Sequence, residues 1–192
     1  HCPLIIRVPK RLEDLWPAEQ PGTQVDRLVS FVDMPKTWLK ITGAEIPAVM
    51  QGQVFLGPEA DPEREYHVSF RERMDERCDN VRAIRNKQFL YVRNYMPFVP
   101  RGQHLTYLWK MEATRAWEAW HKAGQTDAVT GRWFGTKPME ELYDTSKDPD
   151  NVVNLIDQPE YKEVADELRR ELRNWQLKVH DSGLLPEAER VK

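Results

Sequence analysis

The chain has 192 residues, a formal net charge of −3 and a pI near 6.0, with 40% hydrophobic and 31% charged residues. This length accommodates one ordinary domain, or one domain and a piece of another. The composition indicates a folded globular protein, and the slightly acidic balance disfavours a general nucleic-acid binder. No apolar run approaches the roughly 18 residues of a membrane span. We therefore expect neither nucleic acid nor a membrane among its partners.

The first residues, His1-Cys2-Pro3, lead into a continuous apolar run, Leu4-Ile5-Ile6. Such a run is typical of a buried parallel strand. A central strand at this place suggests that the sequence starts in mid-fold, so localisation cannot be read from it. Without neighbouring strands, the run is expected to expose apolar surface. The two cysteines, Cys2 and Cys78, are too few for a disulfide framework, and we expect each to be a buried thiol.

A helix is predicted from Asp33 to Gly43. Asp33 is a plausible N-cap, Pro35 is tolerated in a first helical turn, and Gly43 is a typical stop. Between Pro47 and Pro62 the composition changes to Gly, Pro and Ala with few periodic hydrophobic residues. We expect this segment to separate two structural units, residues 1–58 and 59–192.

A β-hairpin is predicted within residues 69–95, with strands at Val81–Arg85 and Phe89–Asn94. The alternation of side chains along a strand separates a buried from a polar face. The apolar residues expected on the buried face are Ile84, Leu90 and Val92. The arginines expected on the polar surface are Arg82, Arg85 and Arg93.

The segment around this hairpin is rich in charge. From Arg71 to Arg93, seven basic residues stand against four acidic ones, in a chain whose total charge is negative. One reading is a solvated face whose charges pair with one another. The other is an arginine cluster that binds an anion, because a guanidinium group matches two oxygens of a sulfate or carboxylate. The candidate binding residues are Arg71, Arg73 and Arg77.

The second half contains two predicted helices, 105–123 and 161–180, and a short strand at Glu141–Asp144. Apolar residues recur at helical spacing in the last helix, at Val164, Leu168, Leu172, Trp175 and Val179. We expect this stripe to pack on the hairpin sheet. No P-loop, Gly-rich dinucleotide motif, nucleophile elbow or histidine metal pair is present in the sequence.

Four stretches, taken together, resemble the type I sulfatases of the alkaline-phosphatase superfamily. Residues 2–9 resemble the family's VPLIIRxP strand, and residues 29–47 resemble VSxVDxxPTxLxxxGxxxP with Lys36 inserted. Residues 82–94 are similar to the hairpin RxIRxxxxKYIxN. Within residues 141–155, Glu141–Asp144, Asp148-Pro149 and Asn154-Leu155 reproduce their parts of ELYDxxxDPxExxNL. Their order and spacing match the last third of a sulfatase. The ending from Trp175 to Asp181 looks most like the heparan N-sulfatase (sulfamidase) branch.

The resemblance implies an α/β fold overall. Residues 1–58 would be the C-terminal edge of the catalytic domain, with one strand and one helix. Residues 59–192 would be an α+β subdomain, a small antiparallel sheet packed by the C-terminal helix. The missing N-terminal catalytic domain would be a partner of this chain. Family members are periplasmic, extracellular or lysosomal.

The resemblance also implies a formylglycine nucleophile, made from the cysteine of a Cys-x-Pro/Ala-Ser-Arg motif, and one Ca²⁺. Both precede the VPLIIRxP strand in the family. We therefore expect no catalytic residue, no metal ligand and no bound cofactor in this chain, and no activity of the chain alone. Cys78 precedes Arg82 at the right distance, but Asn80 and Val81 replace the required residues.

The implied reaction is hydrolysis of sulfate esters or sulfamates, on sulfated glycans. Arg71, Arg73 and Arg77 would pair with a neighbouring sulfate or uronate, and His1, where many relatives have Arg, would lie near the active-site rim. Glu72-Arg73-Met74 replaces the His-Gln-Glu run of the sulfamidase branch, which argues against its N-sulfoglucosamine specificity. The alternative is a non-catalytic carbohydrate-binding or scaffold module derived from a sulfatase. The coding sequence upstream of His1 discriminates between the two.

Overall fold

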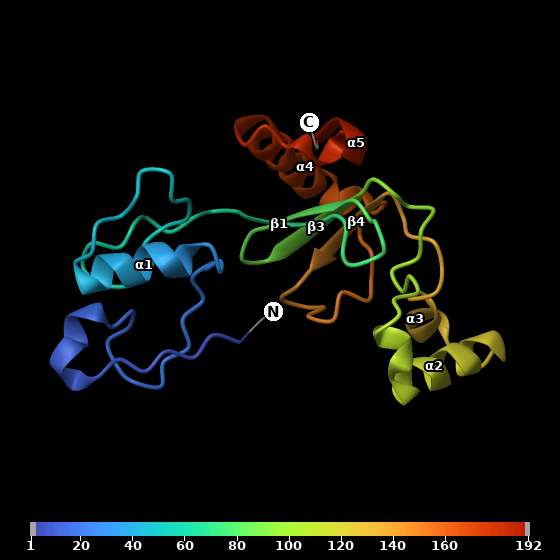
Figure 1. Ribbon diagram of the computed structural model, residues 1–192, viewed down its shortest axis with the longest axis horizontal. Coiled ribbons are helices and arrows are strands. Elements are labelled where there is room, and N and C mark those ends of the chain that lie inside the picture. Colours follow the sequence, from blue (N-terminus) through green and yellow to red (C-terminus); the bar gives the residue numbers. More distant parts are fainter. Residues whose placement is uncertain (1–2, 191–192) are drawn as a thin grey trace. The chain divides into compact units, whose positions relative to one another are not determined.

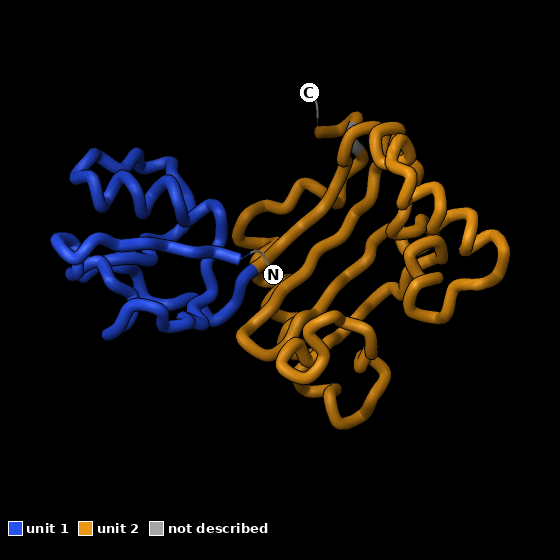
Figure 2. The backbone as a smooth tube through the Cα atoms, turned by 90° about the horizontal axis from the view of Figure 1, so that it is seen from below, with its two compact units in different colours: residues 1–67 blue, residues 68–192 orange. Residues whose placement is uncertain are grey.

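The computed structural model describes residues 3–190 and divides into two compact units, residues 1–67 and 68–192 (Figure 2). The predicted boundary after residue 58 falls inside the first unit. The segment beyond that boundary stays with the first unit because Arg64 pairs with Asp33, with 2.5 Å between Nη2 and Oδ1. In addition, Asp61 Oδ2 accepts a hydrogen bond from the backbone N–H of Val54 at 2.7 Å.

The first unit is built around the helix α1 (Asp33–Thr42), preceded by the short 3₁₀ helix η1 (Lys10–Leu15). The predicted helix is confirmed, and Gly43 ends it in the left-handed conformation with φ 71°. Asp33 has a different role from the expected N-cap, since its side chain is only 1% exposed. It accepts hydrogen bonds from the backbone N–H groups of Ser30 and Gln53, at 2.7 and 2.9 Å. It therefore ties the start of α1 to the loop that follows the helix.

The strand predicted at Leu4-Ile5-Ile6 is wrong for this structure. Residues 3–9 have no regular secondary structure, and Ile5 is 93% exposed. A strand needs a neighbour for its N–H and C=O groups, and no described segment pairs with this run. The apolar surface of Leu4 and Ile5 is exposed, as expected for a run without neighbouring strands. The assignment of residues 1–58 to the edge of a catalytic domain stays a prediction.

The second unit contains a four-stranded sheet in the order β1-β2-β3-β4 (Figure 1). The strands are β1 (His67–Arg71), β2 (Val81–Arg85), β3 (Phe89–Asn94) and β4 (Glu140–Asp144). The β2–β3 and β3–β4 pairs are antiparallel, which confirms the predicted hairpin and the later strand. In the hairpin turn, Asn86 Oδ1 accepts from the backbone N–H groups of Gln88 and Phe89, at 2.9 and 2.7 Å. Its side chain thus replaces a backbone acceptor and fixes the turn.

The C-terminal helix α4 (Lys162–Lys178) covers one face of this sheet (Figure 1). The core between helix and sheet holds apolar side chains that are at most 3% exposed: Ile84, Tyr91, Leu142, Leu168 and Leu172. Burying each side chain of this kind stabilises the fold by about 1.5–3 kcal/mol. The predicted stripe of α4 is confirmed at Leu168 and Leu172, whereas Val179 follows the last helical residue and is 44% exposed.

The predicted division of the hairpin faces is wrong. The register places Ile84 opposite Tyr91, and Tyr91 opposite Leu142, on the face that α4 covers. Because successive side chains alternate, Leu90 and Val92 point to the other face. Arg82 was expected on the surface, but it follows the same alternation as Ile84 and is only 1% exposed.

The remaining helices are short. Between β3 and β4 lie η2 (Leu108–Lys110), α2 (Glu112–Lys122) and α3 (Ala128–Gly131). The single helix predicted over 105–123 is divided at Met111, whose extended backbone (ψ 133°) ends η2 and begins α2. After β4 come η3 (Pro159–Tyr161), η4 (Ser182–Leu184) and α5 (Glu187–Arg190). Within residues 3–190, no helix is long and apolar enough to cross a membrane.

Buried Arg82 holds the end of the chain against the sheet. Its Nε and Nη2 each donate to an oxygen of Asp181 at 2.8 Å, and Nη2 also donates to Glu72 at 2.6 Å. Glu72 pairs in turn with Arg190. The backbone of Gly183 lies directly on this cluster, since a Cβ there would be 1.7 Å from Arg82 Nη2. Asp181 therefore joins the segment after α4 to β2.

We expect this ion pair to make stability depend on acid pH. The hydrogen bonds from Arg82 lower the pKa of Asp181 from 3.8 to about 2, against the opposing effect of burial. A carboxyl with a lowered folded-state pKa stabilises the fold above its unfolded pKa, and loses this contribution as pH falls through the folded one. The difference corresponds to roughly 2 kcal/mol. Urea unfolding at pH 5, 4, 3 and 2 should therefore show the advantage of the unmodified chain over Asp181→Asn shrinking towards pH 2. An advantage that is constant with pH would contradict this.

Candidate functional site

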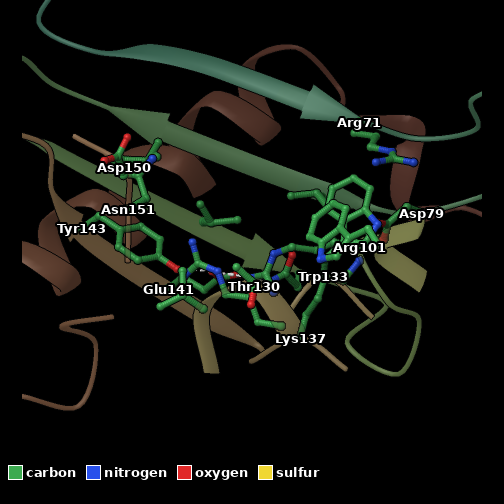
Figure 3. A pocket seen from close by; sticks show the side chains of 17 residues that line it. Arg71, Asp79, Arg101, Thr130, Trp133, Lys137, Glu141, Tyr143, Asp150 and Asn151 are labelled. Atoms are coloured by element: carbon green, nitrogen blue, oxygen red, sulfur yellow. Dashed lines mark hydrogen bonds and ion pairs between the residues drawn. The ribbon is translucent and has the colours of Figure 1, made fainter. Parts of the chain in front are cut away.

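A pocket of about 610 Å³ lies on the face of the sheet away from α4 (Figure 3). The apolar part of its floor comes from the strands, through Val81, Leu90 and Val92. The segment between β3 and β4 supplies the opposite wall. The side chains of Leu90 and Val92 therefore line a pocket and are only partly buried.

Glu141 is the buried centre of the polar floor and is only 4% exposed. Its carboxylate accepts hydrogen bonds from Asn94 Nδ2 and Arg101 Nη2, both at 2.6 Å, and from the hydroxyl of Tyr143. Burial, together with the bond to Glu141, raises the pKa of Tyr143 far above its usual value. Tyr143 is therefore a protonated donor at neutral pH. All partners of this carboxylate are internal, so Glu141 orders the floor and keeps Arg101 in place.

Lys137 and Asp79 form a second internal pair, with 2.5 Å between Nζ and Oδ2. Their side chains are only 2% and 3% exposed. Asp79 Oδ1 also accepts from the backbone N–H of Asn80 at 2.8 Å, directly before β2. The pair thus fixes the segment before β4 to the start of the hairpin.

Two tryptophans form a flat wall beside these charges. The rings of Trp117 on α2 and Trp133 stack with their centroids 5.6 Å apart at 24°. The ring of Trp133 lies against the backbone of Gly102, where a Cβ would be 1.9 Å from the indole nitrogen. The backbone N–H of Gly102 donates to the carbonyl of Trp133 at 2.8 Å. The position of Trp133 therefore requires glycine at position 102, because any side chain there would overlap the indole ring.

Arg71 and Arg132 are the two other cations of the lining. Neither has a carboxylate partner among residues 3–190. Arg132 Nη1 donates to the backbone carbonyl of Val152 at 3.3 Å. Arg71 Nε is covered from solvent and makes no hydrogen bond within the described part of the chain. Leaving a buried donor without an acceptor costs about 1–3 kcal/mol of stability. The placement of Arg71 in this pocket is therefore unfavourable by itself.

The structure separates the residues that the sequence grouped as candidates. Arg71 ends β1 and lines the pocket, whereas Arg73 and Arg77 are exposed on the turn that follows and do not line it. Arg77 Nε donates to the carbonyl of His104 at 2.6 Å. His1 lies outside the described residues. Substrate binding by any of these four stays a prediction.

Sequence reasoning missed most of the lining. Arg101, Trp117, Arg132, Trp133 and Lys137 belong to a segment that the sequence shows only as a helix and an aromatic-rich loop. The abundance of aromatic residues near position 133 was the one available signal. It could not show which strands this segment would cover.

The described residues do not fit a metal or a nucleophile site. Among residues 3–190, no three His, Cys, Asp or Glu side chains gather as metal ligands would. Cys78 is a free thiol that is half-buried rather than buried, and Arg82, four residues later, is already bound to Asp181 and Glu72. Cys2 lies outside the described residues. The expectation that this chain carries no catalytic residue and no metal ligand stays a prediction.

The chain is similar to curated sulfatases along its whole length. It is 37% identical over 192 residues to an ulvan-active sulfatase of Formosa agariphila, and covers 31% of it. A second ulvan-active sulfatase of that organism is 27% identical over 83% of the chain, again covering 31% of the relative. Human N-sulphoglucosamine sulphohydrolase is 30% identical over 53% of the chain, which covers 20% of it. The chain thus spans about a third of these relatives or less. No model of a protein family matches it.

Solved structures show a related fold. A 2-O GAG sulfatase matches 86% of the chain with a TM-score of 0.57 at 20% identity, and the chain covers 29% of it. A putative sulfatase from Bacteroides thetaiotaomicron matches 78% with a TM-score of 0.51 at 21% identity, of which the chain covers 25%. The helix-covered four-stranded sheet is therefore part of a sulfatase-like fold. Together with the full-length similarity to the curated relatives, this confirms the resemblance read from the sequence. The chain belongs to the sulfatase family and corresponds to a part of its members.

Proposed function

We propose that this chain is a portion of a larger sulfatase that removes sulfate from sulfated glycans. The observation that carries the proposal is the 37% identity, over the whole chain, to an ulvan-active sulfatase. The fold is also similar, at a TM-score of 0.50 and 19% identity over 80% of the chain, to a protein solved in complex with its substrate D-glucosamine-2-N,6-O-disulfate; the chain covers 25% of that protein. In this proposal the parent protein has an α/β fold, and residues 1–58 belong to its catalytic domain.

The chain would contribute substrate recognition, while the chemical step is carried out elsewhere. In the parent enzyme, a formylglycine would supply the nucleophile, and a bound Ca²⁺ would offset the negative charge of the sulfate. Among residues 3–190, no group of His, Cys, Asp or Glu side chains fits a metal ion. What the chain offers is Arg71, which ends β1 and lines the pocket, and the exposed Arg73 and Arg77 on the turn that follows. Guanidinium groups bind sulfate and carboxylate oxygens in pairs, and each such charge-assisted bond contributes about 1.5–3 kcal/mol.

We expect the protein encoded by the whole reading frame to release sulfate from ulvan or from a sulfated glycosaminoglycan. Its frame should contain a Cys-x-Pro/Ala-Ser-Arg motif upstream of His1, and replacing the cysteine of that motif with Ala should abolish release. The 192-residue chain alone should release none, because it lacks the nucleophile. Ion chromatography of free sulfate measures all three.

Two results would count against the proposal. A frame without the motif, encoding a protein that releases no sulfate from these glycans, would favour the non-catalytic carbohydrate-binding module instead. Sulfate release by the purified 192-residue chain above a buffer control would show that the division of roles is wrong.

A further inference from the structure

We propose that the pocket on the open face of the sheet is a binding site for a sulfated oligosaccharide, held as an extended polyanion between Arg71 and Arg132. The class of sugar rests on the proposed function. The site itself requires no catalysis by this chain. The charges, the spacing and the aromatic wall of the pocket all favour such a ligand.

The charges of the pocket do not balance internally. Four cations and three carboxylates line it. Two of the cations form ion pairs with buried carboxylates, Lys137 with Asp79 and Arg101 with Glu141. Arg71 and Arg132 remain without a carboxylate partner within residues 3–190. The third acid, Asp150, is exposed. The pocket therefore presents two guanidinium groups that an anionic ligand can use.

These two groups lie at opposite ends of the pocket. Arg71 ends β1, an outer strand of the sheet, and Arg132 is bound to the carbonyl of Val152, beyond the other outer strand. Three strand spacings separate β1 from β4, or about 14 Å. Figure 3 shows Arg71 at one end of the pocket and Asn151, the residue before Val152, at the other. A single sugar ring cannot reach both ends, so the ligand must carry anionic groups on more than one residue.

Between the ends, the pocket suits a sugar better than an inorganic anion. Trp117 and Trp133 both line the pocket and supply apolar aromatic surface that the C–H groups of a sugar can contact. At the Asn151 end, Oδ1 of that residue is a covered acceptor with no donor among the described residues. A ligand that combines an apolar face, hydroxyl donors and spaced negative charges matches this set. Ligand sites of this size commonly combine aromatic walls with a few polar groups.

The first experiment measures binding to the 192-residue chain by titration calorimetry. The probes are a size-fractionated heparin hexasaccharide, the corresponding disaccharide and the desulfated hexasaccharide. We expect the sulfated hexasaccharide to bind, and the disaccharide and the desulfated form to bind at least about tenfold more weakly, because each loses one or both guanidinium contacts. Equal binding of the desulfated form would overturn the role of the two arginines.

The second experiment uses matched variants. Arg71→Ala and Arg132→Ala should each weaken binding of the hexasaccharide by about 10- to 100-fold. Arg173→Ala is the control, because Arg173 is exposed on α4 and does not line the pocket. It should leave binding unchanged. Arg71→Lys and Arg132→Lys keep the charge without the planar fork and should bind with intermediate affinity. Near-UV circular dichroism checks that the tryptophan wall is intact in each variant.

Three results would overturn the inference. They are no binding of the hexasaccharide, an equal loss in Arg173→Ala, and equally tight binding of a single-stranded DNA oligomer of the same charge. The last would indicate a general polyanion site, since aromatic stacking beside cations also suits single-stranded nucleic acid. Failure here is distinguishable from failure of the proposed function. If the whole protein releases sulfate but the 192-residue chain does not bind the hexasaccharide, only the pocket proposal is contradicted. If the chain binds the hexasaccharide but the whole protein releases no sulfate, only the proposed enzymatic function is contradicted.

Discussion

Replacing Arg82 with Met should lower the free energy of unfolding by roughly 3–5 kcal/mol, the usual cost of breaking a buried ion pair by removing one partner. Arg82 is 1% exposed and holds both Asp181 and Glu72. Its loss leaves the carboxylate of Asp181, whose side chain is 9% exposed, without its main partner. The segment after α4 would then have little to hold it against β2. The effect is a large fraction of the 5–15 kcal/mol that stabilises an ordinary domain.

Urea unfolding followed by tryptophan fluorescence measures this loss. Arg173→Met provides the control, because it removes the same charge from an exposed position on α4. It should change stability by less than about 0.5 kcal/mol. If both variants lose the same stability, the ion pair with Asp181 and Glu72 does not hold the fold together.

The second large effect is expected for Lys137→Met, also at roughly 3–5 kcal/mol. This change removes the partner of Asp79 at a site where both side chains are almost fully buried. Among residues 3–190, the remaining carboxylate would keep only the hydrogen bond from the backbone N–H of Asn80. Thermal unfolding by circular dichroism should show a fall in Tm of many degrees.

A double-mutant cycle separates the ion pair from simple packing. Asp79→Leu combined with Lys137→Met removes both charges, so the pair no longer leaves an uncompensated ion behind. Replacing a whole buried pair by apolar residues is often neutral, and we expect the double variant to recover most of the loss. A double variant as unstable as the sum of the two single variants would show that the charges do not interact.

The local sequence pattern predicted the positions of the helices and of the hairpin strands well. It predicted poorly which side chains share a face of the sheet. The hairpin at 81–94 and the helix ending at Gly43 follow from alternation, periodicity and terminal residues, which are properties of neighbouring positions. Which face Ile84 shares with Tyr91 depends on the register, and an error of one residue reverses every side chain. Leu4-Ile5-Ile6 failed for a related reason, because an apolar run becomes a strand only where another strand is present.

The pocket also combines residues that a local sequence pattern reveals with residues that only the folded chain brings together. Arg71 was found because it belongs to a visible run of arginines. Lys137 is far along the chain from its partner Asp79, and no local signal links them. Arg82 was misread because an arginine that alternates along a strand resembles a surface residue. Its partner Asp181 follows the last long helix, and only the folded chain brings the two together.

The contact between Gly102 and Trp133 links the shape of the pocket to the backbone of a residue outside its lining. The indole lies where the first atom of any side chain at position 102 would be. A change of this one residue to alanine would displace the ring and so alter the wall of the pocket. The shape of the pocket therefore depends on a residue that does not itself line it.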